Sequence, residues 1–236
     1  MKTRVMLVVL MGVSTLGSRA AHADEGDEAV SSHRLDTGEI VGRFELGYRG
    51  SFVSGSGYNP FSTNDYLPQL SIGVTRTLAW QGPWSFAAGV AWDYATTGAT
   101  SLGDTTELTL DRLTVPLEGR RRFGRFGYAF VRAAPGIAYE SVEVDDPSVP
   151  GNALTKSRWL FAADLSAGYA VPLWTRRGSG SQLLSHLWAQ ADGGYGFVVD
   201  QRLNLTPNGQ ARADGADLGT LALSGGFFRL SVAASL

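Results

Sequence analysis

A serine next to a histidine is the pair of residues in this sequence most suited to covalent chemistry. Ser185 and His186 are the types that lipases use as nucleophile and general base. Successive strand residues point to opposite faces, so the two side chains cannot form a dyad. His186 shares a face with Asp192, but about 20 Å of strand separates them. The sequence therefore predicts no catalytic residue.

Acidic residues in expected loops are the next candidates for chemistry. Carboxylates bind divalent cations, but the spacing of a calcium loop is not present, so ordinary solvation is the favoured interpretation. The chain has no cysteine, which excludes disulfides and thiolate sites. The sequence predicts no metal and no cofactor. The acidic loop residues are Asp65, Asp104, Glu107, Asp145, Asp146, Asp200, Asp214 and Asp217.

A second charged set alternates with apolar residues inside expected strands, which places it on one face of a sheet. If that face lines the interior of a small barrel, side chains fill the space and the charges must pair. A structural ion-pair network is the favoured interpretation, and a gated narrow pathway for a small solute is the alternative. The expected interior residues are Arg43, Glu45, Asp93, Arg112, Glu118, Arg132, Glu140, Asp164, Asp192 and Arg229.

The stretch Leu70–Tyr94 shows the strands that must position these residues. It alternates twice around a break at Gln81-Gly82-Pro83, giving each arm one bulky apolar face and one small or polar face. A bulky outer face opposite a small inner face is typical of a membrane barrel. Arg76 interrupts the apolar face, so we expect a bulge to turn it inward, unless the assigned register is wrong.

Aromatic residues gather at the strand ends, as in the interfacial girdles of a membrane protein. The two ends of the second arm are separated by about 25 Å of membrane normal. The alternative, a soluble core, would concentrate aromatics in mid-strand. The expected girdles are Trp80, Trp84, Phe126 and Trp174 beside short turns, and Tyr48, Trp92, Tyr94, Tyr139 and Trp159 toward long loops.

About eight strands are expected between Gly38 and Leu236, joined by alternating long and short connections. The predicted fold is all-β: a single closed antiparallel transmembrane β-barrel with short periplasmic turns and long outer loops. Leu108 and Leu110 have the wrong parity for their strand, which predicts a bulge or a rise above the membrane. Pro135 predicts a bulge and a parity switch before Arg132.

The first residues resemble a secretory signal peptide, with a basic start, an apolar run and a small-residue cleavage site over Met1–Ala23. Cleavage removes three basic residues and no acid, so the formal charge changes from −2 to −5. That charge argues against nucleic-acid binding. Asp24–Thr37 is expected to be a disordered periplasmic leader, followed by the barrel domain at 38–236.

Two basic turns are also expected, at Arg120-Arg121-Arg122 with Arg125, and at Arg176-Arg177. They are predicted to touch anionic lipid headgroups or simply to remain solvated.

Signal, alternation and loop rhythm together resemble the small outer-membrane β-barrel proteins, of the outer-membrane protein A transmembrane-domain and outer-membrane protein W type, which are porin-like. The resemblance covers Gly38–Leu236 and is architectural. It implies outer-membrane lipids and the barrel-assembly machinery as partners, and a monomer. Such proteins usually end in an aromatic residue, whereas this chain ends in Leu236.

The sequence thus favours a non-enzymatic barrel of the Gram-negative cell envelope, located in the bacterial outer membrane. Its expected role is structural, surface-interacting or small-solute passage. The alternatives are a soluble, secreted lipocalin-like binder of hydrophobic ligands, and an outer-membrane lipid hydrolase that uses His186.

Overall fold

The computed structural model describes residues 42–53, 55–101, 104–123, 126–145, 153–175, 186–207 and 216–235. The expected signal peptide and leader lie outside these residues. Within the described ranges, no helix is long and apolar enough to cross a membrane. The residues form antiparallel strands and one short 3-10 helix, η1 (Ser56–Tyr58).

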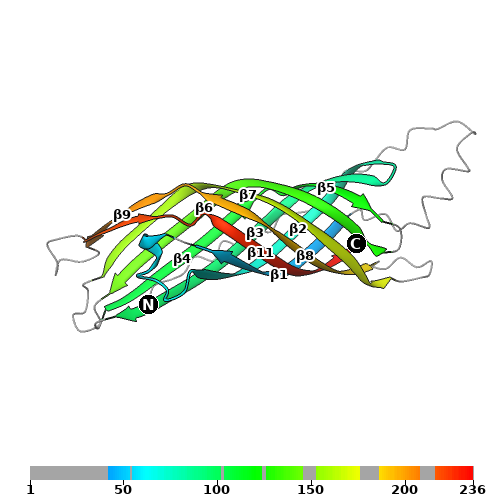
Figure 1. The fold of residues 1–236 in the computed structure, drawn as a ribbon. Coiled ribbons are helices and arrows are strands. Elements are labelled where there is room, and N and C mark those ends of the chain that lie inside the picture. The colour runs from blue at the N-terminus through cyan, green and yellow to red at the C-terminus, as the bar shows by residue number, and fades with distance from the viewer. Residues whose placement is uncertain are drawn as a thin grey trace, which may run out of the picture. The chain divides into compact units, whose positions relative to one another are not determined.

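The strands follow one another up and down the molecule (Figure 1). Their bounds are β1 (Gly42–Phe52), β2 (Tyr66–Gln81), β3 (Trp84–Ser101), β4 (Asp104–Thr114), β5 (Leu117–Arg122), β6 (Tyr128–Asp145), β7 (Leu154–Thr175), β8 (His186–Val198), β9 (Gln201–Pro207), β10 (Ala216–Leu221) and β11 (Gly225–Ser235). The end with the tight β2–β3 connection is called the turn end, and the opposite end the loop end.

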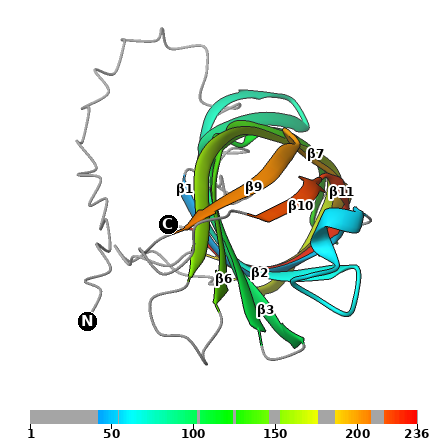
Figure 2. The same ribbon diagram turned by 90° about the vertical axis from the view of Figure 1, so that its left-hand side faces the viewer.

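These strands close into a ring, seen end-on in Figure 2. The order and pairing of the strands give the ring eight members. β4 continues into β5, β8 into β9 and β10 into β11, so each of these pairs counts as one member. β1 pairs with β2 on one side and with β11 on the other, which joins the ends of the sheet. The expected antiparallel all-β ring of about eight strands is confirmed.

In the middle of the ring, polar and apolar side chains alternate along the strands as expected, with the apolar ones outside. On β2, Gln69, Ser71 and Thr75 are buried, whereas Leu70 and Val74 are exposed on the outer surface. The bulky apolar residues therefore face outward and the small or polar residues face inward, the reverse of a soluble barrel. This orientation contradicts the lipocalin-like alternative, which needs an apolar interior at this level.

Nearer the loop end the pattern inverts. On β4, Leu110 is 2% exposed and faces inward, while Leu113, three residues on, is 45% exposed and faces outward. The β4–β6 register runs without a shift from Thr105 to Thr114, so the bulge expected at this place is wrong. The inversion instead indicates a rise: β4 continues beyond the apolar band, which is the middle part of the ring where bulky apolar residues face outward.

A hydrophobic core fills the ring at the loop end, and we call it the loop-end core. Val53, Tyr58 and Phe61 come from the segment around η1, which folds into the ring. β9 and β10 lie over the same end and add Leu203 and Leu221. The other members are Leu67, Ala95, Leu108, Leu110, Ala138, Val142, Leu154, Leu160, Ala162, Val198, Leu205 and Leu223.

A smaller aromatic cluster, the turn-end cluster, fills the opposite end. It contains Tyr128, Phe130, Ala170, Trp188 and Ala233, all buried. Tyr128 packs edge-on against Trp188, whose indole donates a hydrogen bond to the Ser235 hydroxyl at 2.9 Å. Both ends of the interior are thus occupied by side chains.

The bulge and parity switch expected near Pro135 are wrong. The β6–β7 register is constant from Tyr128 to Val144, and Tyr128, Phe130 and Arg132 all face inward together. Pro135 points outward and its carbonyl accepts a hydrogen bond from Val115 N–H at 2.8 Å. A proline in this strand therefore loses one donor without disturbing the pairing.

Some acidic residues that were expected in loops lie on strands. Asp104 and Glu107 belong to β4, and Asp217 belongs to β10. Polar composition suggested loops, but these strands rise beyond the apolar band, where polar outward residues suit a solvated sheet.

Arg76 faces outward, so its expected inward turn is wrong. It pairs with Gly42, the first described residue of β1, and therefore lies at the turn end. The β2 bulge comes after it, between Thr77 and Ala79. Because of that bulge Trp80 pairs with Ser85, so Trp80 and Trp84 lie on opposite faces of the hairpin tip.

Candidate functional site

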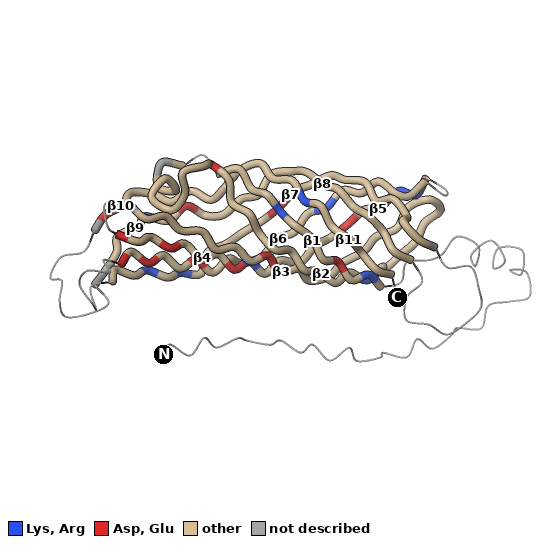
Figure 3. Tube along the Cα trace, turned by 90° about the horizontal axis from the view of Figure 1, so that it is seen from below, with Lys and Arg blue, Asp and Glu red and all other residues tan. Residues whose placement is uncertain are grey.

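The interior of the ring holds all ten charged residues expected there, and each is at most 6% exposed. Figure 3 shows both signs of charge along the middle of the strands. Two further arginines, Arg49 and Arg120, are buried with them. The charges form two ion-pair clusters and two separate acids.

The turn-side ion cluster is built around Glu118. Its carboxylate accepts hydrogen bonds from Arg132 Nε at 2.8 Å, Arg120 Nε at 2.7 Å and Arg43 Nη2 at 3.2 Å. Glu45 accepts from Arg43 at 2.7 Å and from Arg132 at 3.0 Å. These five residues come from β1, β5 and β6, so the cluster ties three strands together across the interior.

The loop-side ion cluster is built around Asp164 on β7. Arg112 donates to it at 2.6 Å and Arg49 donates through both terminal nitrogens. Arg49 also pairs with Asp93 at 3.4 Å, and Arg229 lies 3.9 Å from Asp164. Aromatic rings support the cations, since the Arg49 guanidinium lies 3.9 Å from the centre of the Phe227 ring.

Each cluster holds three arginines and two carboxylates, so each carries one surplus positive charge. A buried ion costs several kcal/mol to desolvate, and hydrogen bonds from several partners offset that cost. The network therefore fixes how the strands meet more than it adds net stability. Removing one carboxylate from a cluster would leave three buried arginines with a single counter-charge.

Asp192 stands between the two clusters without a hydrogen bond of its own. It is directly opposite Arg229 on β11, yet neither of its carboxylate oxygens has a hydrogen-bond partner in the described part of the chain. Gln190 and Ser231 lie opposite each other on the same two strands, and their side-chain polar atoms also have no hydrogen-bond partner among the described residues. Buried polar groups need partners, and ordered water suits such a group of polar atoms.

Glu140 is the other separate acid, and it lies at the loop end. Tyr139 is the last large apolar residue on the outer face of β6, so the neighbouring Glu140 lies beyond the apolar band. Its side chain is enclosed among residues of the loop-end core, with no hydrogen-bond partner for either oxygen among the described residues. Burial raises the pKa of Glu140 to about 7, and nearby Lys156 opposes that shift.

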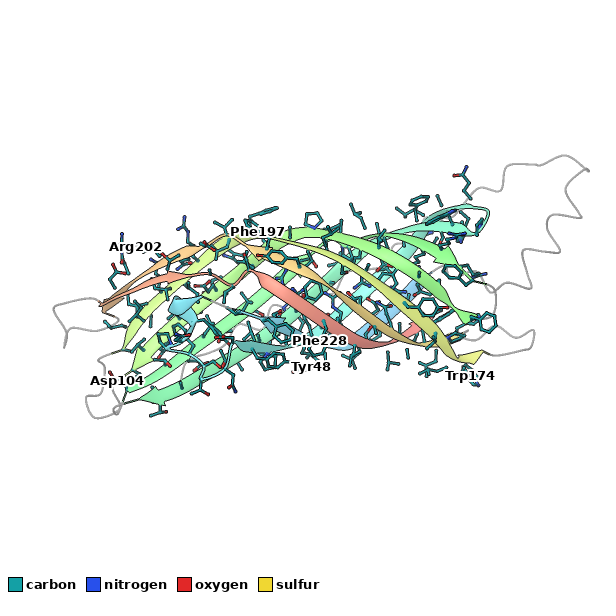
Figure 4. The ribbon with its side chains drawn as sticks, viewed as in Figure 1. Tyr48, Asp104, Trp174, Phe197, Arg202 and Phe228 are labelled. Carbon is teal, nitrogen blue, oxygen red and sulfur yellow. The ribbon has the colours of Figure 1, made fainter. Side chains whose placement is uncertain are left out.

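The expected girdle aromatics lie on the outer surface, except Trp80, which lies on the opposite face of the hairpin tip from Trp84. Trp174 lies at the turn end, and Tyr48 packs beside Phe228 nearer the loop end (Figure 4). Tyr94 is half-buried beside the ring of Trp92, and Tyr139 is half-buried beside the ring of Trp159. Trp80, Trp84, Phe126, Trp92 and Trp159 are exposed. Phe52, Tyr66, Tyr195 and Phe197 extend the set beyond the expected residues.

The basic turns are only partly as expected. Arg120 was expected to lie in a turn, but it is buried and donates to Thr75 at 3.0 Å and to Thr77 at 3.3 Å. β5 continues to Arg122, and alternation along it turns Arg120 inward and Arg121 outward. The expected turn at Arg176-Arg177 lies outside the described residues.

The histidine considered for catalysis stacks on an aromatic ring. His186 lies 5.8 Å from Trp188, centre to centre, at the turn end of β8. Ser185 lies outside the described residues. Within the described ranges, no group of three or more histidine, aspartate or glutamate residues is placed to hold a metal ion. The geometry gives His186 a packing role at the rim of the turn-end cluster.

The interior is therefore filled at four successive levels: the turn-end cluster, the turn-side ion cluster, the loop-side ion cluster and the loop-end core. The residues facing inward at these levels are almost fully buried. This arrangement supplies cross-strand rigidity and separates the two ends of the ring.

No protein-family model and no curated protein matches the sequence. Among solved structures, the chain resembles the crystal structure of Ail, the attachment invasion locus protein of Yersinia pestis, in complex with the heparin analogue sucrose octasulfate. That match has 11% identity and a TM-score of 0.43, and it covers 83% of this chain and 97% of that one.

A second crystal structure of Ail from Yersinia pestis gives a TM-score of 0.42 at 11% identity. It covers 84% of this chain and 99% of that one. The likeness concerns fold alone.

Proposed function

We propose that this protein is a non-enzymatic, non-conducting β-barrel of the bacterial outer membrane whose outer part makes contacts at the cell surface. The single observation that supports this proposal best is the inversion of the side-chain pattern along the strands. Apolar residues face outward in the middle of the ring, and polar residues face outward nearer the loop end. A band of hydrocarbon followed by water is the environment that suits this change.

The part beyond the band is a rigid platform rather than a set of loose loops. β3, β4, β6 and β7 continue through it as paired strands, and the loop-end core fills it from within. Its outward face presents threonines, serines and acids, such as Thr109, Ser141 and Glu143. A fixed polar surface of this kind suits recognition of a partner outside the cell.

Passage of a small solute is the competing role, and the filled interior argues against it. Phe61 and Tyr58 occupy the loop end, and Trp188 and Tyr128 occupy the turn end. An eight-stranded ring has room for side chains and little else. In planar bilayers we therefore expect insertion of the folded protein without conductance steps.

The experiment combines that conductance measurement with outer-membrane fractionation and heat-modifiable gel mobility. Expected results are a heat-modifiable protein in the outer-membrane fraction and a silent bilayer trace. Discrete steps from the heat-modifiable form would establish passage in place of surface contact. Recovery only in the soluble exported fraction would contradict the membrane location.

A further inference from the structure

The outer surface of the ring has an apolar groove, and an exposed arginine lies two residues further along β5 from one of its lining residues. The groove has a volume of about 350 Å³ and lies across β3, β5 and β6 near the turn end. Leu78, Phe86, Leu117, Val131 and Leu165 form its raised sides, and all are exposed. Small residues form its floor: Ala88, Gly119 and Ala133.

Gly119 makes the floor low. It pairs with Phe86 on β3 and with Val131 on β6, both of which project outward beside it. A Cβ atom at Gly119 would meet the Val131 and Phe86 side chains at 3.7 and 3.9 Å, which is ordinary contact. The depression therefore comes from a missing side chain and not from a backbone that only glycine can adopt.

Arg121 stands at the turn end of this groove. It follows Gly119 by two residues on the same face of β5, about 7 Å along the strand. Its guanidinium lies 5.5 Å from the ring centres of both Trp84 and Phe123. These rings hold the cation at the surface. In the described part of the chain, no carboxylate forms an ion pair with Arg121.

We propose that this groove and Arg121 form a binding site for an anionic phospholipid. One acyl chain lies over Ala88, Gly119 and Ala133, and the phosphate binds the guanidinium of Arg121. The charge is complementary, and the phosphate comes to lie just outside the apolar band, where a headgroup belongs. The inference rests on the proposed membrane location and adds a lipid class and a site to it.

A second groove of about 460 Å³ provides a matched control. It is floored by Ala189 and Ala191 on β8, between Tyr169, Val171, Leu230 and Val232. Its lining residues include no arginine or lysine. A hydrocarbon chain suits both grooves, but in the first one Arg121 follows the lining residue Gly119 by two positions on β5, whereas the lining of the second contains no cation. The two grooves therefore separate a specific lipid site from general lipid coverage.

The test uses the folded protein in neutral detergent micelles, titrated with phosphatidylglycerol or phosphatidylethanolamine of identical chains. Bound lipid is counted by native mass spectrometry. One surface arginine predicts about five-fold tighter binding of the anionic lipid. Gly119→Leu, which fills the groove, and Arg121→Gln should each abolish that preference, and Ala191→Leu should keep it.

Ala133→Leu fills the same floor from β6 and replaces Gly119→Leu if that variant does not fold. Equal binding of the two lipids to the wild-type protein would overturn the proposal. So would a preference that survives filling of the groove, because the net negative charge of the headgroup at Arg121 would then explain it without the groove. Heat-modifiable mobility of the same samples reports folding, so loss of this site is distinguishable from failure of the membrane assignment.

Discussion

Glu118 and Arg132 lie directly opposite each other on β5 and β6 and form an ion pair of 2.6 Å inside the ring. Glu118 also accepts from Arg43 and Arg120, so one carboxylate contacts three buried cations. Loss of the Glu118 carboxylate would leave buried arginines without enough negative charge to balance them, which is strongly destabilising.

Glu118→Gln is therefore expected to destabilise the protein by about 3–5 kcal/mol, because three buried arginines lose their shared counter-charge. The measurement is the urea midpoint of unfolding in micelles, followed by gel mobility. Asp217→Asn is the control: its ion pair with Arg202 is exposed to solvent, so its removal should shift the midpoint far less. Similar midpoints for both variants would show that the interior pairs are not what holds the strands.

Leu110→Ala and Leu113→Ala test the inversion on a single strand. Leu110 is enclosed in the loop-end core, so its truncation is expected to cost about 2–5 kcal/mol through lost contacts and a cavity. Leu113 faces outward, where lipid or detergent fills the space, and its truncation should cost less. The same urea titration measures both, and a larger loss for Leu113→Ala would contradict the assigned faces.

Glu140→Gln tests the unpaired acid beyond the band. Because burial raises the pKa of Glu140 to about 7, the folded protein holds a proton that the unfolded chain releases above its ordinary pKa of 4.5. Wild-type stability should therefore fall as the pH rises from 5 to 8, by up to about 3 kcal/mol. The variant should lack this fall. Parallel pH profiles for the two proteins would indicate that Glu140 is already charged in the folded state.

Single cysteines can locate the boundary on living cells, since the chain has none of its own. Thr109→Cys and Ser141→Cys lie on the polar outward face of β4 and β6, and Leu113→Cys and Ile137→Cys lie on the apolar part of the same strands. A membrane-impermeant maleimide should label the first two and not the second two. Labelling of all four would show that no hydrocarbon covers this surface.

The ring and the interior charges were predictable because a two-residue period places every second side chain on the same face. Leu108 and Leu110 gave a second signal, because they place apolar residues at the alternate positions where the rest of their strand has polar ones. That signal left a bulge and a rise equally open, because a bulge moves side chains to the other face, whereas a rise keeps the face and makes the inward residues apolar. Only the continuous register of β4 with β6 separates them.

Other features depended on where each strand ends. Arg120 looked like part of a solvated turn, but β5 continues through it and alternation turns it inward. Arg76 looked costly in mid-membrane, but its pairing with Gly42 places it at the turn end. The inward folding of Tyr58 and Phe61 was not predictable, because a Gly/Ser/Asn/Pro-rich segment gives no period that assigns its side chains to a face.

The polar outward face beyond the apolar band has a consequence for biogenesis. In the proposed orientation Glu107, Asp111 and Glu143 must cross the hydrocarbon core of the bilayer before the apolar band is inserted into it. Each charged group transiently exposed to acyl chains adds to that barrier. Unassisted entry into thick vesicles is therefore expected to be slow, and short-chain lipids or a catalyst that thins the bilayer should accelerate it.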